Sequence, residues 1–157
     1  MTTAPPTPDD LLKLDNQLCF ALVTAARNVV GLYRPILEPL GLTHPQYLVM
    51  LALWERSPRS LRELAGELAL EPATLSPLVK RLEAQGLVTR ARREGDERVL
   101  DVELTETGRA LRRRALAVPE QVMARTGMTV ADLAMLRDTL KDFAGAEPKW
   151  GSAPRDD

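Results

Sequence analysis

Cysteine and histidine are nearly absent from this chain of 157 residues, which contains one of each. A single cysteine excludes an intrachain disulfide framework and a cysteine-rich zinc site. A single histidine means that one subunit cannot assemble a conventional Ser-His-Asp triad or a metal site with several histidine ligands. We therefore expect the protein to use neither a metal nor a cofactor.

Long apolar runs are also missing, and neither sign of charge is in large excess. No apolar stretch approaches the roughly 20 residues of a membrane span, and the N-terminus shows no secretory signal. The formal net charge is −1, so any affinity for nucleic acid has to come from local clusters of Lys and Arg. The length suits a single domain with a sizeable core. These features predict a cytoplasmic protein that does not bind membranes.

The most informative stretch is residues 61–104, which begins with two short predicted helices. Ser60 and Glu63 have the spacing of a capping box at the start of the first helix. The second helix opens at Pro72, because the N–H that proline lacks would be unpaired at the first helical position. Gly86 ends this helix as a C-terminal cap residue would. The spacing of its apolar residues predicts a buried stripe of Leu75, Leu78, Val79 and Leu82.

Two segments of alternating polarity follow these helices and predict a β-hairpin. Residues 87–93 form the first candidate strand and residues 98–104 the second. The intervening residues 94–97 supply the turn, in which Gly95 can take a positive φ. Two helices followed by a hairpin are the order of a winged helix-turn-helix, so this region is predicted to bind DNA.

The candidate DNA contacts lie on the polar face of the second helix and on the hairpin. Hydroxyls and cations reach base edges and phosphates in a major groove, and the helix offers Thr74, Ser76, Lys80 and Arg81. The hairpin adds Arg90, Arg92, Arg93 and Arg98. We expect Arg98 to enter a minor groove, with Asp96 holding its guanidinium. The alternative is a solvated, salt-bridged hairpin, but its position directly behind the two helices favours a DNA-contacting wing.

An amphipathic helix is expected before this region, over about residues 9–40. Pro35 and Pro39 should interrupt it, because proline removes a helical hydrogen bond, and Gly41 should close it. A second capping-box pattern, Thr43-His44-Pro45-Gln46, then opens the next helix.

Two further helices are expected after the hairpin. Thr105 starts the first, which should reach about Arg125. Gly127 separates it from the second, which starts at Thr129. The terminal helices have more apolar surface than the small core can cover, which predicts a two-fold homodimer. Such a dimer places two reading helices about one DNA turn apart, roughly 34 Å, on a pseudo-palindromic site.

The chain is thus expected to form one domain over residues 9–145. Within it, a winged helix-turn-helix over about residues 45–104 lies between dimerisation helices over about 9–40 and 105–145. Residues 1–8 and 146–157 are expected to be disordered tails.

The pattern from about Leu11 to Phe143 resembles the MarR-type winged-helix repressors. The motifs that carry the resemblance are Leu78-Val79-Lys80-Arg81-Leu82-Glu83, Gly86-Leu87-Val88, Asp96-Glu97-Arg98 and Leu104-Thr105-Glu106-Thr107-Gly108. The resemblance implies a mainly α fold with a small β-hairpin, in which N- and C-terminal dimerisation helices flank the winged helix-turn-helix core. It also implies a homodimeric repressor that binds a pseudo-palindromic operator in double-stranded DNA.

Within this family the chain is similar to the OhrR-type organic hydroperoxide sensors of the single-cysteine type. The similarity rests on Leu14-Asp15-Asn16-Gln17-Leu18-Cys19-Phe20, Tyr33-Arg34-Pro35, Pro45-Gln46-Tyr47-Leu48 and Thr74-Leu75-Ser76-Pro77-Leu78. It implies that an organic hydroperoxide oxidises Cys19, and that tyrosine hydroxyls, Tyr33 among them, hydrogen-bond the sulfur across the dimer. A straight helix would separate Cys19 from Tyr33 by about 21 Å, which also favours a contact between subunits.

The chain departs from this subfamily at the sulfur site. Val23 and His44 stand where further tyrosines are usual. His44 can donate to a thiolate, more strongly when protonated, or it can be a helix N-terminal residue with no such role. In the second helix of the reading head, Pro72 and Ala73 replace the usual Ser-Gly pair, which affects operator preference. Some members trap the oxidised sulfur with a second cysteine; here a sulfenic acid at Cys19 would condense with a low-molecular-weight thiol or oxidise irreversibly.

Three hypotheses therefore remain open. The first is a repressor that releases its operator when Cys19 is oxidised. The second is a MarR-type repressor controlled by a small-molecule ligand between the dimer helices and the winged helix, with Cys19 an inert small hydrophobe. The third is a thiol peroxidase in which Cys19 turns over, which the sequence disfavours because it contains no resolving cysteine and does contain a predicted DNA-reading core.

Overall fold

The structure is a computed structural model that describes residues 6–144. The α-helices are α1 Pro8–Leu11, α2 Leu18–Leu37, α3 His44–Glu55, α4 Leu61–Glu67, α5 Pro72–Ala84, α6 Glu106–Ala115, α7 Val118–Thr126 and α8 Val130–Ala144. The strands are β1 Arg59–Ser60, β2 Val88–Arg93 and β3 Asp96–Leu104, and two 3-10 helices span Leu14–Asn16 and Glu38–Leu40. The predicted fold class, mainly α with a small β-hairpin, is confirmed. None of the helices described has both the length and the apolar character needed to cross a bilayer.

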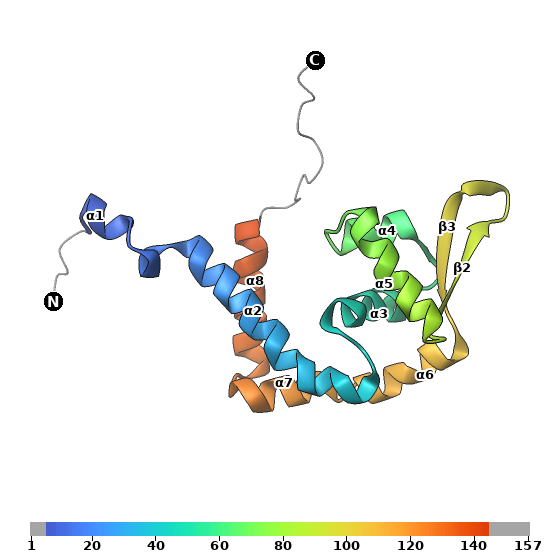
Figure 1. The fold of residues 1–157 in the computed structure, drawn as a ribbon. Coiled ribbons are helices and arrows are strands. Elements are labelled where there is room, and N and C mark those ends of the chain that lie inside the picture. The colour runs from blue at the N-terminus through green and yellow to red at the C-terminus, as the bar shows by residue number, and fades with distance from the viewer. Residues whose placement is uncertain (1–5, 145–157) are drawn as a thin grey trace, which may run out of the picture.

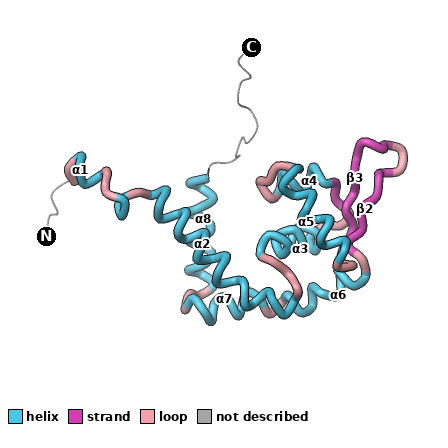
Figure 2. The backbone as a smooth tube through the Cα atoms, in the orientation of Figure 1, coloured by secondary structure: helices cyan, strands magenta, loops and turns pink. Residues whose placement is uncertain are grey.

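The helices form two groups on either side of a junction (Figure 1). The winged-helix lobe contains α3, α4, α5 and the sheet. Figure 2 shows the strands, in magenta, on this side of the molecule. The helical lobe contains α2, α7 and α8, with α2 packed against α7. Helix α6 runs from the base of the hairpin towards α7 and so links the two lobes.

The core of the winged-helix lobe is built around α3. Helices α3, α4 and α5 and the two long strands all contribute buried side chains to this core. They are Val49, Met50, Leu53, Leu64, Leu75, Val79, Leu82, Val88 and Val102. Three of the four residues in the predicted stripe of α5 are fully buried, and Leu78 is half-buried at its edge. The reading helix is therefore fixed to the core by one face, which leaves its other face to solvent.

The helix boundaries follow the predicted capping residues. Both capping boxes form: the hydroxyl of Ser60 accepts from the amide of Glu63 at 3.1 Å, and that of Thr43 accepts from the amide of Gln46 at 3.4 Å. Gly86 has φ +75° directly after α5, which is the left-handed conformation expected of a helix-ending glycine.

The hairpin is tighter than predicted. Arg93 pairs with Asp96, so Glu94 and Gly95 alone form the turn and β3 begins two residues before the predicted start at Arg98. Gly95 has φ +86°, as a two-residue hairpin turn requires.

Strand β1 was not predicted, because two residues are too few to show an alternating pattern. It pairs antiparallel with β3, giving the sheet order β1-β3-β2. The guanidinium of Arg59 is buried here and forms an ion pair with Glu67 of α4. This pair ties the edge of the sheet to the helix that precedes the reading helix.

The helix predicted over residues 9–40 closes at Gly41 as expected, but it is wrong at its N-terminal end, and Pro35 does not interrupt it. Its N-terminal part is broken before Leu18, where the side chains of Asn16 and Gln17 donate to the carbonyls of Asp10 and Leu11, both at 2.6 Å. Such side-chain bonds compete with the helical backbone. At the other end, Pro35 lies inside α2, which continues to Leu37 before the 3-10 turn and Gly41 end it.

The helix predicted from Thr105 to about Arg125 is in fact two helices. Thr105 caps α6 as expected, but α6 ends at Ala115 and α7 begins at Val118. Pro119 occupies the first turn of α7, where it lacks the N–H that a continuous helix would need. Of the predicted disordered tails, residues 1–5 and 146–157 lie outside the described residues, whereas Thr7 caps α1.

The side chains of Gln85 and Trp54 form hydrogen bonds at the junction between the lobes. Gln85, which follows α5, donates to the carbonyl of Gly41 at 2.7 Å and accepts from the side-chain amide of Gln46 at 3.2 Å. Trp54 of α3 donates its indole N–H to the carbonyl of Gly108 in α6 at 2.8 Å. Each bond joins elements that are far apart in the sequence.

Gly108 gives the first testable prediction. A Cβ atom at this position would collide with the carbonyl oxygen of Leu87, which is held in place because it accepts from the amide of Thr105 at 3.0 Å. Gly108→Ala should therefore lower the free energy of unfolding by about 1–3 kcal/mol, measured by urea denaturation. Gly66→Ala is the control, because nothing lies within 4 Å of its added methyl group and alanine is the better helix former. Equal stabilities of the two variants would contradict the steric argument.

Candidate nucleic-acid interface and thiol site

A basic groove lies between α5 and the hairpin. Its volume is about 770 Å³, and its wall contains the predicted residues Ser76, Lys80, Arg90, Arg92, Arg93, Asp96 and Arg98. Thr74 and Arg81 are exposed on α5 but do not line this groove. The structure therefore gathers most of the predicted DNA contacts on one surface of the winged-helix lobe.

The four arginines of the hairpin fall into two pairs with different surroundings. The guanidinium of Arg90 donates to Glu83 of α5 at 2.9 Å. The guanidinium of Arg93 donates to both carboxylate oxygens of Asp101 in β3, at 2.9 and 2.7 Å. These guanidinium groups lower the pKa values of the two carboxyl groups through side-chain hydrogen bonds. Arg92 and Arg98 are exposed, and neither forms an ion pair within residues 6–144. The second pair is the one available to phosphates.

The predicted role of Asp96 is wrong in its detail. Its carboxylate accepts from the backbone amide of Arg98 at 3.2 Å and forms no ion pair with the guanidinium in the part of the chain that the structure describes. The bond shapes the start of β3 beside the turn, which leaves the Arg98 side chain free to extend.

Arg62 is a groove residue that the sequence reasoning missed. It is exposed in the first turn of α4 and lines the groove beside Ser60 and Pro72. The available signal was that Arg62 lies outside the apolar stripe of this helix and so places a cation on the helix before the reading helix.

Cys19 is exposed in the protomer and lies in the first turn of α2. Because the helix begins at Leu18 and not near residue 9, backbone N–H groups without helical partners surround the start of this turn. Such a helix end favours an anion. Tyr33 lies in the same continuous helix fourteen residues later, so about 21 Å separates the two within one protomer.

The other two predicted thiol-site residues lie together. The rings of Tyr33 and His44 are 5.1 Å apart between centroids, in an edge-to-face arrangement, and Tyr47 lies 5.9 Å from Tyr33. Burial raises the pKa of Tyr33 and lowers the pKa of His44 from its ordinary value of 6.5. This burial disfavours the protonated imidazole, which is the form expected to bind a thiolate most strongly. Tyr47 was missed as a member of this cluster.

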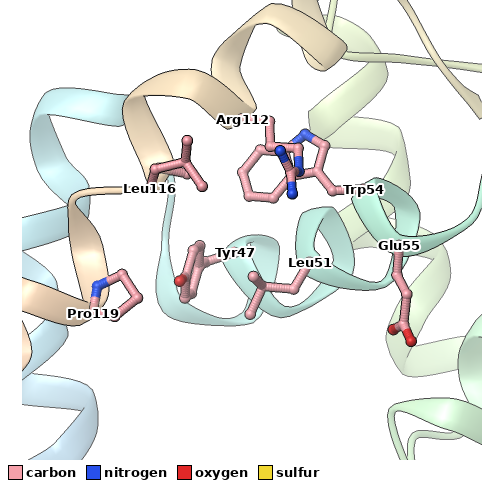
Figure 3. A pocket seen from close by; sticks show the side chains of 8 residues that line it. Tyr47, Leu51, Trp54, Glu55, Arg112, Leu116 and Pro119 are labelled. Carbon is pink, nitrogen blue, oxygen red and sulfur yellow. The ribbon is translucent and has the colours of Figure 1, made fainter. Parts of the chain in front are cut away.

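An apolar pocket of about 310 Å³ lies where α3 faces the junction of α6 and α7 (Figure 3). Tyr47, Leu51 and Trp54 project into it from α3, opposite Leu116 and Pro119. Arg112 and Glu55 supply its charged groups. The pocket is open to solvent and is placed between the two lobes.

Both terminal parts of the helical lobe expose apolar side chains. Those of α2 are Leu18, Phe20, Val23, Val29 and Val30, and those of α8 are Val130, Met135, Leu136, Leu140 and Phe143. The apolar excess that predicted a dimer is thus present on the surface of the protomer. Many exposed apolar side chains on two neighbouring elements are typical of an interaction site.

Comparison with known proteins agrees with these features. A family model described as the transcriptional regulator SarA/Rot matches residues 31–114. The organic hydroperoxide resistance transcriptional regulator of Bacillus subtilis is 40% identical over 131 residues, covering 83% of this chain and 89% of its own length. A MarR-family transcriptional regulator from Rhodococcus superposes with a TM-score of 0.75 at 29% identity, covering 85% of this chain and 96% of its own.

A third relative, AbfR of Staphylococcus epidermidis, has been solved in several states. Reduced AbfR bound to DNA superposes with a TM-score of 0.71 at 32% identity, covering 87% of this chain and 96% of its own. The same relative is known in an overoxidised, DNA-bound state and in a disulfide-formed state.

Arg98 gives the second prediction. Arg98→Ala should weaken binding to a duplex selected by the wild-type protein from a random-sequence pool by about 1–3 kcal/mol, because an exposed groove cation is lost. Sedimentation should show the oligomeric state unchanged. Lys80→Ala, measured in parallel, should weaken binding to all sequences and reduce the salt slope by about one if it contacts a phosphate. Unchanged affinity of Arg98→Ala at matched salt would remove Arg98 from the interface.

Proposed function

The chain belongs to the MarR-type winged helix-turn-helix transcriptional regulators, and from this premise we propose that it is a homodimeric repressor whose DNA binding is controlled by oxidation of Cys19. In the reduced state two copies bind a pseudo-palindromic operator. An organic hydroperoxide oxidises the thiol, and the operator is released. Members of this family are regulators and not enzymes, which removes the thiol peroxidase hypothesis.

The DNA-binding half of the proposal is supported by the basic groove beside α5. Reading helices enter the major groove of DNA, and a wing contacts the flanking minor groove or backbone. A dimer formed through the exposed apolar faces of α2 and α8 carries two such grooves. Their spacing then selects half-sites about one turn apart, roughly 34 Å.

The observation that carries the redox half is the position of Cys19. The thiol is exposed in the first turn of α2, and the apolar side chains of Leu18 and Phe20 beside it belong to the proposed dimer face. The attacking form of cysteine is the thiolate, and a helix N-terminus favours an anion. A hydroperoxide with an apolar substituent would be retained by the surrounding apolar groups.

The proposed reaction is a two-electron oxidation of sulfur. The Cys19 thiolate attacks the terminal oxygen of the peroxide, which carries the hydrogen; an S–O bond forms, the O–O bond breaks, and the leaving alkoxide takes up a proton to become an alcohol. The product is a sulfenic acid. A low-molecular-weight thiol can then displace water from it to give a mixed disulfide. The chain has one cysteine. Cys19 therefore cannot form a disulfide with another cysteine position of this sequence, either in its own subunit or in the partner.

Tyr33 and His44 are proposed to face the sulfur from the other subunit. Within one protomer Tyr33 is too distant from Cys19 along α2, whereas Tyr33 and His44 already lie 5.1 Å apart as one cluster. In the dimer, the partner subunit's Tyr33 would donate its hydroxyl to the thiolate. A neutral imidazole at His44 can also donate through an N–H.

Ligand control is the second candidate, because of the apolar pocket in Figure 3. A small apolar molecule bound between Trp54 and Leu116 would contact both α3 and α6, and so would bias the arrangement of the two lobes. In that case Cys19 takes no part in the control of DNA binding. The two candidates differ in whether the thiol is needed for release.

Cys19→Ser gives the third prediction. After stoichiometric cumene hydroperoxide, wild-type protein should release the selected duplex, and Cys19→Ser should remain bound, because serine cannot form a sulfenic acid. The assay is run with and without a small thiol such as cysteine, since overoxidised AbfR is found on DNA and a mixed disulfide adds more bulk than the oxidised sulfur alone. Mass spectrometry identifies the adduct. If the serine variant releases DNA as readily as wild type, ligand control becomes the better account.

Tyr33→Phe gives the fourth prediction. This variant should bind DNA as wild type does but react with the hydroperoxide more slowly, because a hydroxyl that stabilises the thiolate is lost. The rate is followed by stopped-flow detection of sulfenic acid. His44→Phe is measured beside it: a rate equal to wild type assigns no role to the imidazole. A Tyr33→Phe rate equal to wild type would contradict the proposed sulfur environment.

A further inference from the structure

We propose that Glu83 and Arg90 form a clamp that fixes the hairpin to the reading helix, so that Arg90 is a positioning residue for DNA binding and not a phosphate contact. The inference rests on the DNA-binding half of the proposed function and is independent of Cys19. It separates Arg90 from Arg92, two arginines that a strand pattern places on the same face.

The clamp consists of three hydrogen bonds to one carboxylate. The backbone amide of Arg90 donates to Oε2 of Glu83 at 3.0 Å, and Nε and Nη2 of Arg90 donate to Oε1 at 3.2 and 2.9 Å. Glu83 lies in the last turn of α5 and Arg90 is the third residue of β2. The bonds therefore connect the end of the reading helix directly to the base of the hairpin.

The surroundings of Arg90 agree with a positioning role. The Arg90 side chain is 24% exposed, because it lies in the angle between α5 and β2, whereas Arg92 is exposed further along the strand. A guanidinium that donates two hydrogen bonds to one carboxylate has a fixed direction. If Arg90 turned to a phosphate, the Glu83 carboxylate would be left unpaired beside the DNA, where like charges repel.

The base of the hairpin is also where a small rotation has the largest effect. Beyond Arg90, β2 continues for three residues to Arg93, roughly 10 Å at about 3.3 Å per residue. A rotation of about 10° at Arg90 would therefore move Arg93 by roughly 1.7 Å by the same geometry, and Arg98 lies towards that end of the hairpin. A shift of this size exceeds the tolerance of a hydrogen bond. The clamp thus determines where the free arginines of the wing meet DNA.

Charge removal at Glu83 distinguishes the two roles of Arg90. Glu83→Gln keeps the size of the side chain but removes a negative charge beside the DNA. If Arg90 were a phosphate contact, freeing it from the carboxylate would tighten binding. If the pair is a clamp, the substitution should weaken binding about tenfold, and the slope of log Kd against log salt should not change, because no phosphate contact is lost.

The full experiment is a double-mutant cycle with Glu83→Gln, Arg90→Gln and the double variant, measured on the selected duplex between 50 and 200 mM salt. We expect each single variant to lose about tenfold in affinity with an unchanged salt slope, and the double variant to lose no more than either one, since the same interaction is removed. Arg92→Ala is the matched control and should reduce the slope by about one. Urea denaturation of every variant identifies losses that come from unfolding.

Two outcomes overturn the proposal. Tighter binding by Glu83→Gln, or a salt slope lowered by about one in Arg90→Gln, would make Arg90 a phosphate contact. A failure of the DNA-binding assignment itself is distinguishable, because Arg92→Ala and Arg98→Ala would then also leave affinity unchanged.

Discussion

The polar junction at Gln85 is the constraint on which the arrangement of the two lobes depends. One amide side chain donates to the carbonyl of Gly41, at the end of the helical lobe, and accepts from Gln46, which is buried at the start of α3. The reading helix therefore ends on a group that is bonded to both lobes. Gln46 is buried, so its side-chain amide would be left without this partner if Gln85 were lost, which is costly. The end of α5 is therefore held against the start of α3, and the exposed Gln85 adds a link to the end of the helical lobe through Gly41.

A second connection runs through the aromatic residues of α3. Tyr33 of α2 packs near Tyr47, Tyr47 lies 6.4 Å from Trp54, and Trp54 bonds to the carbonyl of Gly108 in α6. Gly108 in turn packs closely on the backbone of Leu87 at the base of the hairpin. Packed side chains and hydrogen bonds of this kind can carry a change at a dimer interface to a distant site when the elements have two arrangements. The proposed thiol site and the wing are thus joined by contiguous contacts.

Local signals were sufficient to predict most of the fold. Capping residues, Pro72 and Gly86 located the helices of the reading head, and alternation located β2 and β3. Errors arose where side chains act on the backbone over a few residues. Asn16 and Gln17 break the first helix through bonds to nearby carbonyls, and no periodicity reports such bonds. Pro35 lacks the N–H that would bond to the carbonyl of Gly31, yet α2 continues past it to Leu37, so the expected interruption does not occur.

The candidate site was predictable in its residue types but not in its contacts. Composition alone cannot tell Arg90 from Arg92, because both have the same charge and strand phase; only the turn at Gly86 brings Glu83 back to one of them. Likewise, the chemical setting of Cys19 depends on where α2 begins, which the broken segment before it determines. A residue two positions inside a helix end meets free N–H groups, whereas one in mid-helix does not. The electrostatic environment of Cys19 therefore depends on where α2 begins, and the side-chain amides of Asn16 and Gln17 determine that position.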